Sequence, residues 1–322
     1  MTILITGAAG FIGYHLAQYL LNQGKVIIGI DNLNDHYDVN LKRARLANLQ
    51  LNPRFSFQTL DLTNQNELQK LITENPEITE VVHLAAQAGV RASLTNPYAY
   101  VQANVMAPVT LFEACRHLPE LKRLIYASSS SVYGANQKLP FSINDPVDHP
   151  ISIYAATKRA SELLSYTYNH LYDMPITGLR FFTVYGPWGR PDMSAFLFTK
   201  AILTGDEIAL FNQGDMRRNF TYVEDAVHGI VGCLEQLPSN KGHQIYNIGN
   251  NKTEPLMRFI NILETLLGKK AKIRLEGMQA GDVKETIADI SESTRDFGFI
   301  PKTNIEDGLR HFVDWYRSFY AL

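Results

Sequence analysis

The feature that most constrains the fold of this chain lies at its start, where a strand pattern passes through glycines into a helix pattern. The run Thr2–Thr6 is apolar and rich in β-branched residues, and the glycine-rich stretch Gly7–Gly13 follows it directly. From Phe11–Leu20 apolar residues recur at helical spacing, and Gly24 ends that pattern. A strand, a tight turn and a helix in this order predict a βαβ unit, the building block of a parallel sheet.

The glycines of this turn, Gly7, Gly10 and Gly13, also indicate a binding site. Backbone N–H groups in such a turn can approach a pyrophosphate at the helix N-terminus, although a tight turn without a ligand has the same composition. The spacing Gly-x-x-Gly-x-x-Gly differs from the commonest dinucleotide fingerprint. The next strand pattern, Lys25–Ile30, ends in Asp31, and an acid about 20 residues after the glycines can bind the adenine-side ribose. Asp31 would repel a 2′-phosphate, which favours NAD over NADP, while a turn-capping acid is the alternative.

Strand and helix patterns continue to alternate through the first half of the chain. Further strands are predicted near Phe55–Thr59, Val81–Leu84 and Leu124–Ala127. Such alternation predicts an α/β fold of Rossmann type, with a doubly wound parallel sheet. Residues that directly follow strands lie at the carboxyl edge of the sheet, where ligands bind, and these are Asp61, Leu62, Leu84, Ala85 and Ala86.

Two polar residues in apolar surroundings permit more than one interpretation. We interpret His83, alone in an apolar strand, as a core residue. Asn104 lies in a long helical stretch that begins after Pro97, and it is as consistent with a solvated amide as with a ligand contact.

Composition excludes several classes of protein. The chain has 322 residues, 45% of them hydrophobic, which suffices for one large domain or two unequal lobes. A net charge of −2 without a basic run argues against a nucleic-acid partner. No apolar run reaches the length of a membrane span, and no basic leader precedes the first strand. Cys115 and Cys233 stand in no zinc or disulfide motif. We therefore expect a cytoplasmic protein without a metal site or a membrane partner.

A second motif, in the middle of the chain, indicates alcohol oxidation. Tyr154 and Lys158 are four residues apart, so on a helix they share one face. An ammonium near a phenol lowers the pKa of the phenol. The resulting phenolate can take a proton from a sugar hydroxyl while a hydride leaves the same carbon. The spacing alone is equally typical of a helix-surface pair, although Tyr154 is the only tyrosine with a lysine four places on.

Together these motifs resemble the extended short-chain dehydrogenase/reductases, more narrowly the nucleotide-sugar 4-epimerases, and most closely those acting on UDP-glucuronate. The resemblance covers nearly the whole chain. Besides the glycine turn, it rests on Asp31, Asp61-Leu62, His83–Ala86, Gln87–Arg91, Ser128–Ser131, Asp148–Pro150, Tyr154 with Lys158, Leu179–Met193, Arg218–Tyr222 and Gly281–Val283. It implies an isomerase of polysaccharide biosynthesis that inverts C4 of UDP-glucuronate to give UDP-galacturonate, through a 4-keto intermediate.

The resemblance assigns catalysis to three residues. Ser129 would share a hydrogen bond with the sugar O4, Tyr154 would remove the O4 proton, and Lys158 would hold the nicotinamide ribose and lower the pKa of the tyrosine. NAD would stay bound and be regenerated in each cycle. The residues expected to bind it are Gly7, Gly10, Phe11, Ile12, Gly13, Asp31, Asn32, Asp61, Leu62, Leu84, Ala85, Ala86, Asn104, Tyr154, Lys158 and Phe181.

The same resemblance places the UDP-sugar. Arg218 and Asp282 match residues that bind the diphosphate and ribose, and Asn219 departs from the Asp common after that arginine. Leu210, Asn212 and Gln213 stand at a position for uracil contacts, although an edge strand ending in a polar turn has the same pattern. The full predicted set is Arg91, Ser129, Ser130, Ser131, Tyr154, Thr183, Arg190, Leu210, Asn212, Gln213, Arg218 and Asp282.

The serine run and two arginines are candidates for binding a sugar carboxylate. A 4-keto uronic acid is a β-keto acid that readily loses CO2, so its carboxylate must be held. Ser130 and Ser131 are suitable donors to an anion, although a serine run can also satisfy its own backbone. In the resembled family the serine pair and the arginine matching Arg190 bind the carboxylate; Arg91 is the further candidate, and contact with the diphosphate is the alternative for both arginines. Related dehydratases and decarboxylases carry an acid beside the catalytic Ser/Thr, whereas both positions after Ser129 are serine.

The two halves of the chain are organised differently. We expect residues 1–180 to form the NAD-binding domain and 181–322 to form mainly a smaller mixed α/β substrate lobe, with a return to the large sheet near 220–240. Helices are expected near Ser194–Leu203, Glu224–Leu237 and Pro255–Leu267, strands at Ile208–Phe211 and Lys272–Leu275, and a final helix up to about Tyr320. By analogy with the family, the helices around Pro97–His117 and Ile151–Asp173 would form a homodimer interface. A UDP-hexose 4-epimerase, a UDP-glucuronate decarboxylase and a non-catalytic NAD sensor remain alternatives.

Overall fold

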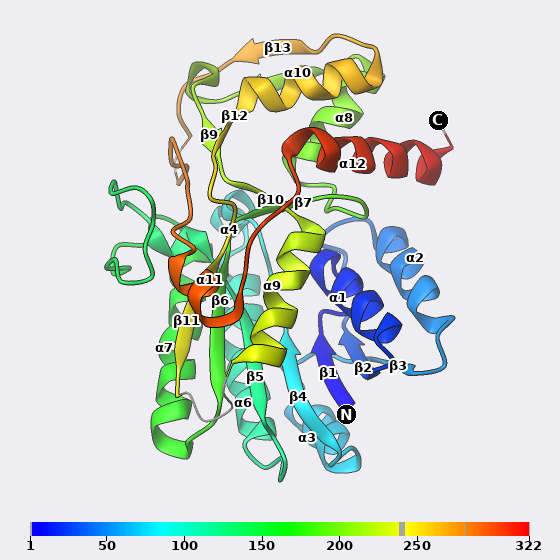
Figure 1. The fold of residues 1–322 in the computed structure, drawn as a ribbon, viewed down its shortest axis with the longest axis vertical. Helices are drawn as coiled ribbons and strands as arrows, with labels where there is room; N and C mark the ends of the chain where they lie inside the picture. Colours follow the sequence, from blue (N-terminus) through cyan, green and yellow to red (C-terminus); the bar gives the residue numbers. More distant parts are fainter. Residues whose placement is uncertain (1, 238–241, 280, 322) are drawn as a thin grey trace.

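A seven-stranded parallel sheet forms the centre of the larger lobe in a computed structural model that describes residues 2–237, 242–279 and 281–321 (Figure 1). The strands lie in the order β11-β6-β5-β4-β1-β2-β3, and each neighbouring pair is parallel. They are β1 (Thr2–Thr6), β2 (Val26–Asp31), β3 (Phe55–Thr59), β4 (Ile78–His83), β5 (Arg123–Ser129), β6 (Ile176–Phe181) and β11 (Gln244–Ile248). The predicted α/β Rossmann-type sheet is therefore confirmed.

The two faces of the sheet carry separate hydrophobic clusters, because successive side chains of a strand point to opposite sides. Ile3 and Ile5 of β1 belong to one cluster, and Leu4 between them belongs to the other. The first cluster includes residues of α1 (Phe11–Asn22), α2 (Val39–Gln50), α9 (Val223–Gln236) and α11 (Ser291–Phe297); the second includes residues of α3 (Gln65–Glu74), α6 (Ala107–Cys115) and α7 (Ile153–Tyr172). Helices thus cover both faces, as a doubly wound sheet requires.

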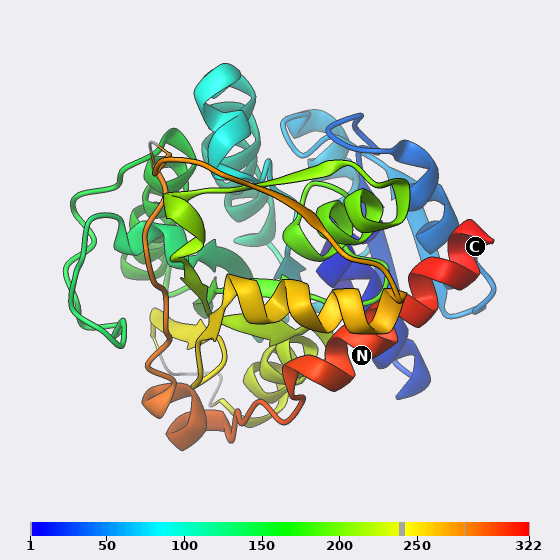
Figure 2. The same cartoon turned by 90° about the horizontal axis from the view of Figure 1, so that it is seen from above.

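A smaller lobe stands beyond the carboxyl ends of the strands, at the top of Figure 1. It holds three two-stranded sheets, β10-β7, β12-β9 and β13-β8. Its elements are β7 (Thr183–Tyr185), α8 (Ser194–Thr204), β8 (Glu207–Leu210), β9 (Arg217–Arg218), β10 (Phe220–Tyr222), β12 (Glu254–Pro255), α10 (Leu256–Leu267), β13 (Lys272–Leu275) and α12 (Ile305–Tyr320). Figure 2, which looks down on this lobe, shows α10 beside α12, and the two helices are in contact.

The second half of the chain also contributes to the larger lobe. After β10, helix α9 packs against α1, and β11 adds a strand beside β6 at the edge of the sheet. The chain therefore crosses between the lobes several times, and no single position separates them. The expected division at residue 180 remains a prediction about domain function.

Irregular helical segments lie where the chain passes the carboxyl edge of the sheet. They are α4 (Val90–Thr95), α5 (Pro97–Val101), a π-helical turn (Gln102–Met106) and the 3-10 turn Ser130–Tyr133; a second 3-10 turn, Asn212–Gly214, follows β8 in the smaller lobe. The helical stretch predicted to follow Pro97 thus contains one wider turn, a feature that is frequent at functional sites. Among the described residues, no helix is long and apolar enough to cross a membrane.

Candidate active site

A cavity of about 1220 Å³ lies between the sheet and the smaller lobe, and residues from the whole length of the chain line it. Strand order reverses between β1 and β4, and in open α/β sheets the crevice at such a switch point binds ligands. The glycine turn and Asp61 line one region of the cavity, while Arg218 and Asp282 line another. A volume of this size exceeds that of a single drug-sized ligand site, which fits a cofactor together with a substrate.

The glycine turn brings backbone N–H groups to the cavity. Gly7 has φ +73, and a Cβ there would lie 2.7 Å from Ala85 N, while a Cβ on Gly13 would lie 2.1 Å from Gly7 O. Only glycine fits these approaches. Gly10 caps α1 without a side-chain hydrogen bond, and no acid stands in the first turn. The first N–H groups of α1 therefore remain available for an anion, which fits a dinucleotide pyrophosphate.

Two aspartates stand at the ends of neighbouring strands beside that turn. Asp31 accepts a hydrogen bond from Leu33 N at 2.8 Å, and burial raises its pKa despite this bond and the charge of Lys42. Asp61 accepts hydrogen bonds from Thr63 and, at 2.9 Å, from Asn32. Although burial opposes them, these bonds hold the pKa of Asp61 below its usual value. A pair of carboxylates at this edge fits the ribose hydroxyls of a dinucleotide.

Tyr154 and Lys158 lie on the first turns of α7, which begins after the N-cap Ser152. Lys158 donates to the carbonyl of Ala127 at 2.9 Å, and burial lowers its pKa to about 8. Burial raises the pKa of the Tyr154 phenol, opposed by its hydrogen bond with Ser129 and by the charge of Arg190. The groups that oppose this rise are Ser129 and Arg190, and the expectation that Lys158 lowers the pKa of Tyr154 stays a prediction.

The side chain of Asn104 is buried in the π-helical turn and faces protein atoms. Its Oδ1 accepts from Gln87 N at 2.9 Å, and its Nδ2 donates to Gln87 O at 2.9 Å and to Thr157 Oγ1 at 3.1 Å. With an exposed fraction of 1%, Asn104 is not a solvated amide. It also lies outside the residues that line the cavity. Asn104 thus fixes the segment after β4 against α7 instead of presenting its amide to a cofactor.

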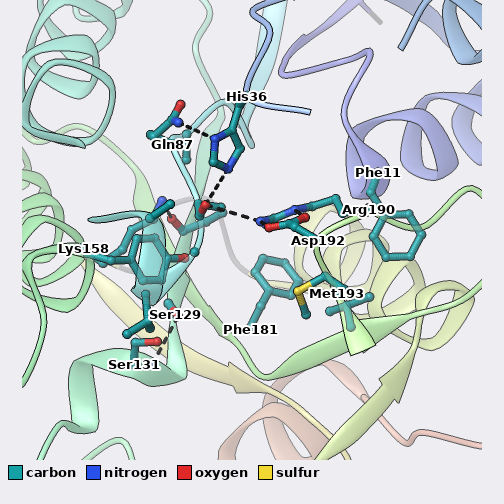
Figure 3. A pocket seen from close by; sticks show the side chains of 18 of the residues that line it. Phe11, His36, Gln87, Ser129, Ser131, Lys158, Phe181, Arg190, Asp192 and Met193 are labelled. Atoms are coloured by element: carbon teal, nitrogen blue, oxygen red, sulfur yellow. Dashed lines mark hydrogen bonds and ion pairs between the residues drawn. The ribbon is translucent and has the colours of Figure 1, made fainter. Parts of the chain in front are cut away.

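Arg190 lies on the loop between β7 and α8, and Figure 3 shows its ion pair with Asp192. Nε donates to Asp192 Oδ1 at 3.0 Å and Nη2 to Asp192 Oδ2 at 2.5 Å. Nη2 also donates to Ala88 O at 3.3 Å. Burial opposes the charge on Arg190, but Asp192 raises the pKa of the guanidinium above its usual value. Thr183, Ser130 and Ser131 line the same cavity.

Arg91 has different partners from Arg190. It forms an ion pair with Asp282 at 3.3 Å, and its guanidinium lies 4.5 Å from the centre of the Phe211 ring. Arg218, whose Nη1 donates to Arg217 O and Lys284 O, lines the cavity as well. Burial lowers the pKa of Arg218, with Asp282 opposing and Arg91 contributing. Arg91, Arg218 and Asp282 therefore form one charged group on the wall of the cavity.

The comparisons with known proteins agree with this geometry. Residues 3–249 match the model of the NAD dependent epimerase/dehydratase family. The chain belongs to that family. It is 44% identical to UDP-glucuronate 4-epimerase 2 of Arabidopsis thaliana over 99% of this chain and 76% of the relative. It is also 48% identical to protein CapI of Staphylococcus aureus over 99% of each chain. A crystal structure of UDP-glucuronic acid 4-epimerase from Bacillus cereus, in complex with UDP-glucuronic acid and NAD, matches with a TM-score of 0.93 and 37% identity over 99% of this chain and 100% of that one.

Most residues predicted to bind ligands in this epimerase/dehydratase family member lie together in the cavity. Apart from Asn104, every residue expected to contact NAD lines it. The lining residues expected to contact the UDP-sugar are Arg91, Ser129, Ser130, Ser131, Tyr154, Thr183, Arg190, Arg218 and Asp282.

The predicted uracil contacts are the exception. Leu210 has no exposed surface and packs in the core, and Asn212 donates to Asp215 O at 2.7 Å. Neither these two nor Gln213 lines the cavity, whereas Ala209 and Phe211 do. Leu210 points away from the cavity because strand side chains alternate, while Asn212 and Gln213 lie in the 3-10 turn that follows β8.

Several lining residues of this family member escaped the sequence analysis, namely His36, Tyr37, Lys42, Asp192, Met193 and Phe211. The segment after β2 has no periodic pattern that would place His36 or Lys42. Asp192 could have been found, because it lies two residues after Arg190 within a stretch already singled out.

Proposed function

We propose that this protein is an NAD-dependent 4-epimerase that interconverts UDP-glucuronate and UDP-galacturonate. The observation that carries the proposal is the joint placement of Ser129, Tyr154 and Arg190 in the cavity that the glycine turn also lines. A hydroxyl and a phenol serve proton transfer at a sugar alcohol, and a guanidinium serves a carboxylate. The similarity to structures with bound UDP-glucuronic acid and NAD supports both ligands.

Different residues of the chain transfer the proton and stabilise the charge in this reaction. NAD, which the glycine turn, Asp31 and Asp61 would hold, would supply the acceptor for the hydride of C4 and its donor to the other face of the sugar. Tyr154 takes the O4 proton and gives it back, and Ser129, which lines the same cavity, keeps O4 beside the phenol. Lys158, fixed on Ala127 O, places a cation where it favours the phenolate once the site is filled. Between the two transfers the ketosugar turns about its bond to UDP.

The carboxylate of the 4-keto intermediate needs a binding site of its own. Such a β-keto acid loses CO2 when the C5–C6 bond overlaps the carbonyl, so the enzyme must hold the carboxylate out of that alignment. Ser130, Ser131 and Thr183 provide hydroxyl donors and Arg190 a charged one. The pairing of Arg91 with Asp282 supports a role for Arg91 at the UDP diphosphate instead.

Ser129 and its neighbours also weigh against the other candidate functions. A decarboxylase of this type would carry an acid beside the catalytic hydroxyl, and Ser130 and Ser131 occupy those places. A protein that only senses NAD has no use for Ser129 and Tyr154 in the same cavity. A UDP-hexose epimerase would have no carboxylate for Arg190 to bind.

The decisive experiment incubates purified protein with UDP-glucuronate and no added cofactor, and follows products by NMR and NADH by absorbance. We expect a mixture of UDP-glucuronate and UDP-galacturonate, with no net NADH and no pentose. The Tyr154→Phe variant should retain NAD and lose turnover. A UDP-pentose would identify a decarboxylase, and turnover of UDP-glucose alone would refute the carboxylate site.

We further propose that the protein is a homodimer that works in the cytoplasm and supplies UDP-galacturonate for polysaccharide biosynthesis. The support for the dimer is an apolar surface on α4, α5 and α7, which pack on one another. Exposed fractions there are 52% for Leu94, 82% for Tyr98, 54% for Leu163 and 59% for Tyr166. A surface of this kind marks an interaction site.

Light scattering after size-exclusion chromatography tests the dimer. Wild-type protein should have twice the chain mass, and the double variant Tyr98→Asp, Leu163→Asp should have the mass of one chain. Leu51→Asp is the matched control, because Leu51 is 84% exposed at the end of α2, outside this surface. A monomeric wild type would refute the proposal.

A further inference from the structure

The arginine to which we assign the substrate carboxylate is already occupied by a carboxylate of the protein. Asp192 accepts from both Nε and Nη2 of Arg190, at 3.0 and 2.5 Å. This is the two-point geometry in which arginine binds carboxylates most strongly. In the part of the chain that the structure describes, Asp192 is the one acidic partner in an ion pair with Arg190. A substrate carboxylate would therefore bind a guanidinium whose charge is already partly balanced by Asp192.

The loop that carries this pair is held at several points of its backbone. Trp188 packs against Trp315 and Phe319, with ring centres 5.4 and 5.1 Å apart. The buried Arg45 of α2 donates to the carbonyls of Trp188, at 2.6 Å, and Gly189, at 3.3 Å. The loop also closes on itself, since Met193 N donates to Arg190 O at 3.1 Å. The pair is thus a built feature of the site.

The backbone beside the pair fixes Arg190 from the other side. Ala88 O accepts from Arg190 at 3.3 Å, from Tyr100 at 3.0 Å and from His36 at 2.9 Å, as Figure 3 shows for His36 and Arg190. A Cβ on Gly89 would lie 3.8 Å from both Arg190 Nη2 and Asp192 Oδ2, so the pair rests against this backbone. Nε and Nη2 are consumed by these contacts.

The remaining amine of the guanidinium, Nη1, is the one left for a ligand. Within residues 2–237, 242–279 and 281–321, no hydrogen bond involves Nη1 of Arg190. The charge of Arg190 acts on Tyr154, where it opposes the rise in pKa that burial causes. The guanidinium is therefore held with one amine free and close enough to influence the catalytic phenol.

We propose that Asp192 is a specificity-determining positioning residue, which orients Nη1 of Arg190 and limits the pull of this arginine on a uronic carboxylate. The inference rests on the proposed function and deepens it. A neutral UDP-hexose leaves the pair undisturbed and gains nothing from it. A UDP-uronic acid binds through Nη1 and the hydroxyls, but not so tightly that the ketosugar cannot turn or the product cannot leave.

The test compares two substitutions at Asp192 in the NAD-loaded protein. Asp192→Asn keeps an acceptor beside Arg190 and removes the charge, so UDP-glucuronate should bind roughly five- to tenfold more tightly. UDP and UDP-glucose should bind as before. Because the product also binds more tightly, kcat and KM for the uronic acid should both fall. Asp192→Ala removes the orientation as well, so kcat/KM for UDP-glucuronate should fall and the fraction of UDP-pentose should rise.

Two further variants separate this inference from the proposed function. Asp282→Asn is the matched control, because Asp282 pairs with Arg91 in the same cavity and should change UDP and UDP-glucuronate binding alike. Arg190→Ala should weaken UDP-glucuronate binding selectively. If it does so while Asp192→Asn leaves uronate binding unchanged, or weakens all three ligands equally, the role of Asp192 is refuted and the proposed function stands. If Arg190→Ala affects UDP and UDP-glucuronate equally, the carboxylate site itself is refuted.

Discussion

The two regions of the cavity are built in different ways. The cofactor region is formed by strand ends, glycines and uncapped N–H groups of α1, with Asp31 and Asp61 as its carboxylates. The substrate region is formed by charged side chains from distant segments that are paired with one another, Arg91 with Asp282 and Arg190 with Asp192. The first depends on where the backbone lies, and the second depends on which side chains balance each other.

This difference predicts how each region responds to substitution. Where two backbone segments are in contact there is no room for a Cβ, so a substitution of the glycine should abolish cofactor binding instead of weakening it slightly. Altering an ion pair that faces a cavity should change the free energy of unfolding only slightly. It can raise or lower the affinity for the ligand that binds there. The cofactor region should therefore be intolerant of change and the substrate region adjustable.

The largest effect is expected from Gly13→Ala. The added Cβ would lie 2.1 Å from Gly7 O, so the turn must open and the N–H groups that face the pyrophosphate must move. We expect protein that purifies without NAD, measured by absorbance after denaturation. Gly277→Ala is the control, since a Cβ there meets nothing within 4 Å. Full NAD content in Gly13→Ala would contradict the prediction that the cofactor region does not tolerate substitution.

The buried pair Glu162–Arg180 should give the next largest effect. Glu162 of α7 accepts from Nε of Arg180 on β6 at 2.8 Å and from Nη2 at 2.9 Å, and both side chains are almost fully buried. Removing one partner leaves an uncompensated buried charge, so Glu162→Gln should lower the free energy of unfolding by about 3–5 kcal/mol. Urea denaturation measures this.

An exposed pair in the smaller lobe provides the contrast with Glu162. Lys284 lies 2.6 Å from Asp215, and their side chains are 60% and 64% exposed. Lys284→Met should therefore change the free energy of unfolding by less than about 1 kcal/mol. Similar losses at Glu162 and Lys284 would show that burial does not separate the two kinds of pair.

Asn219 tests whether the smaller lobe also has a rigid point. Its Nδ2 donates to the carbonyls of Asn250 and Lys252, and its Oδ1 accepts from Asn250 N at 2.7 Å, with no surface exposed. Asn219→Asp would aim a carboxylate at two carbonyls, so we expect a loss of about 3 kcal/mol in urea denaturation. Asn64→Asp is the control, because Asn64 only accepts, from Glu67 N as the cap of α3, and Asp caps as well as Asn. Equal stability of the two variants would contradict this.

The sequence predicted best those features that a local pattern controls. The alternation that puts Ile3 and Leu4 on opposite faces, and the glycines before α1, were enough to predict the parallel sheet and its ligand edge. The spacing of Tyr154 and Lys158 likewise predicted their shared helix face. Such features need no knowledge of distant contacts.

Features that depend on contacts between distant segments were missed or misread. Asn104 was expected to face a ligand or water, but it pairs with Gln87, which lies 17 residues earlier in the same connection after β4, and only the fold brings the two together. Leu210 was predicted to contact uracil but is buried in the core, because the sequence does not mark which face of a short strand turns inward. The partner of Arg190 was missed although it is close in sequence, since a nearby acid does not reveal which ion pair forms.

An effect of about 2 kcal/mol, smaller than those expected at Glu162 and Asn219, is predicted where the two regions meet. His15 of α1 donates through Nε2 to Pro187 O at 2.8 Å, on the loop that carries Arg190, and burial lowers its pKa to about 4 despite this bond. The folded protein therefore binds fewer protons than the unfolded chain between pH 6.5 and 4, so stability falls as pH falls through this range. His15 should account for about 2 kcal/mol of the loss between pH 7.5 and pH 5. In His15→Gln the amide can still donate to Pro187 O, but it does not titrate. Urea denaturation at the two pH values should therefore show a smaller loss of stability for this variant than for the wild type. His170→Gln, an exposed histidine on α7, is the control and should keep the wild-type pH dependence. If His15→Gln keeps it as well, His15 is not a neutral link between the cofactor region and the substrate region.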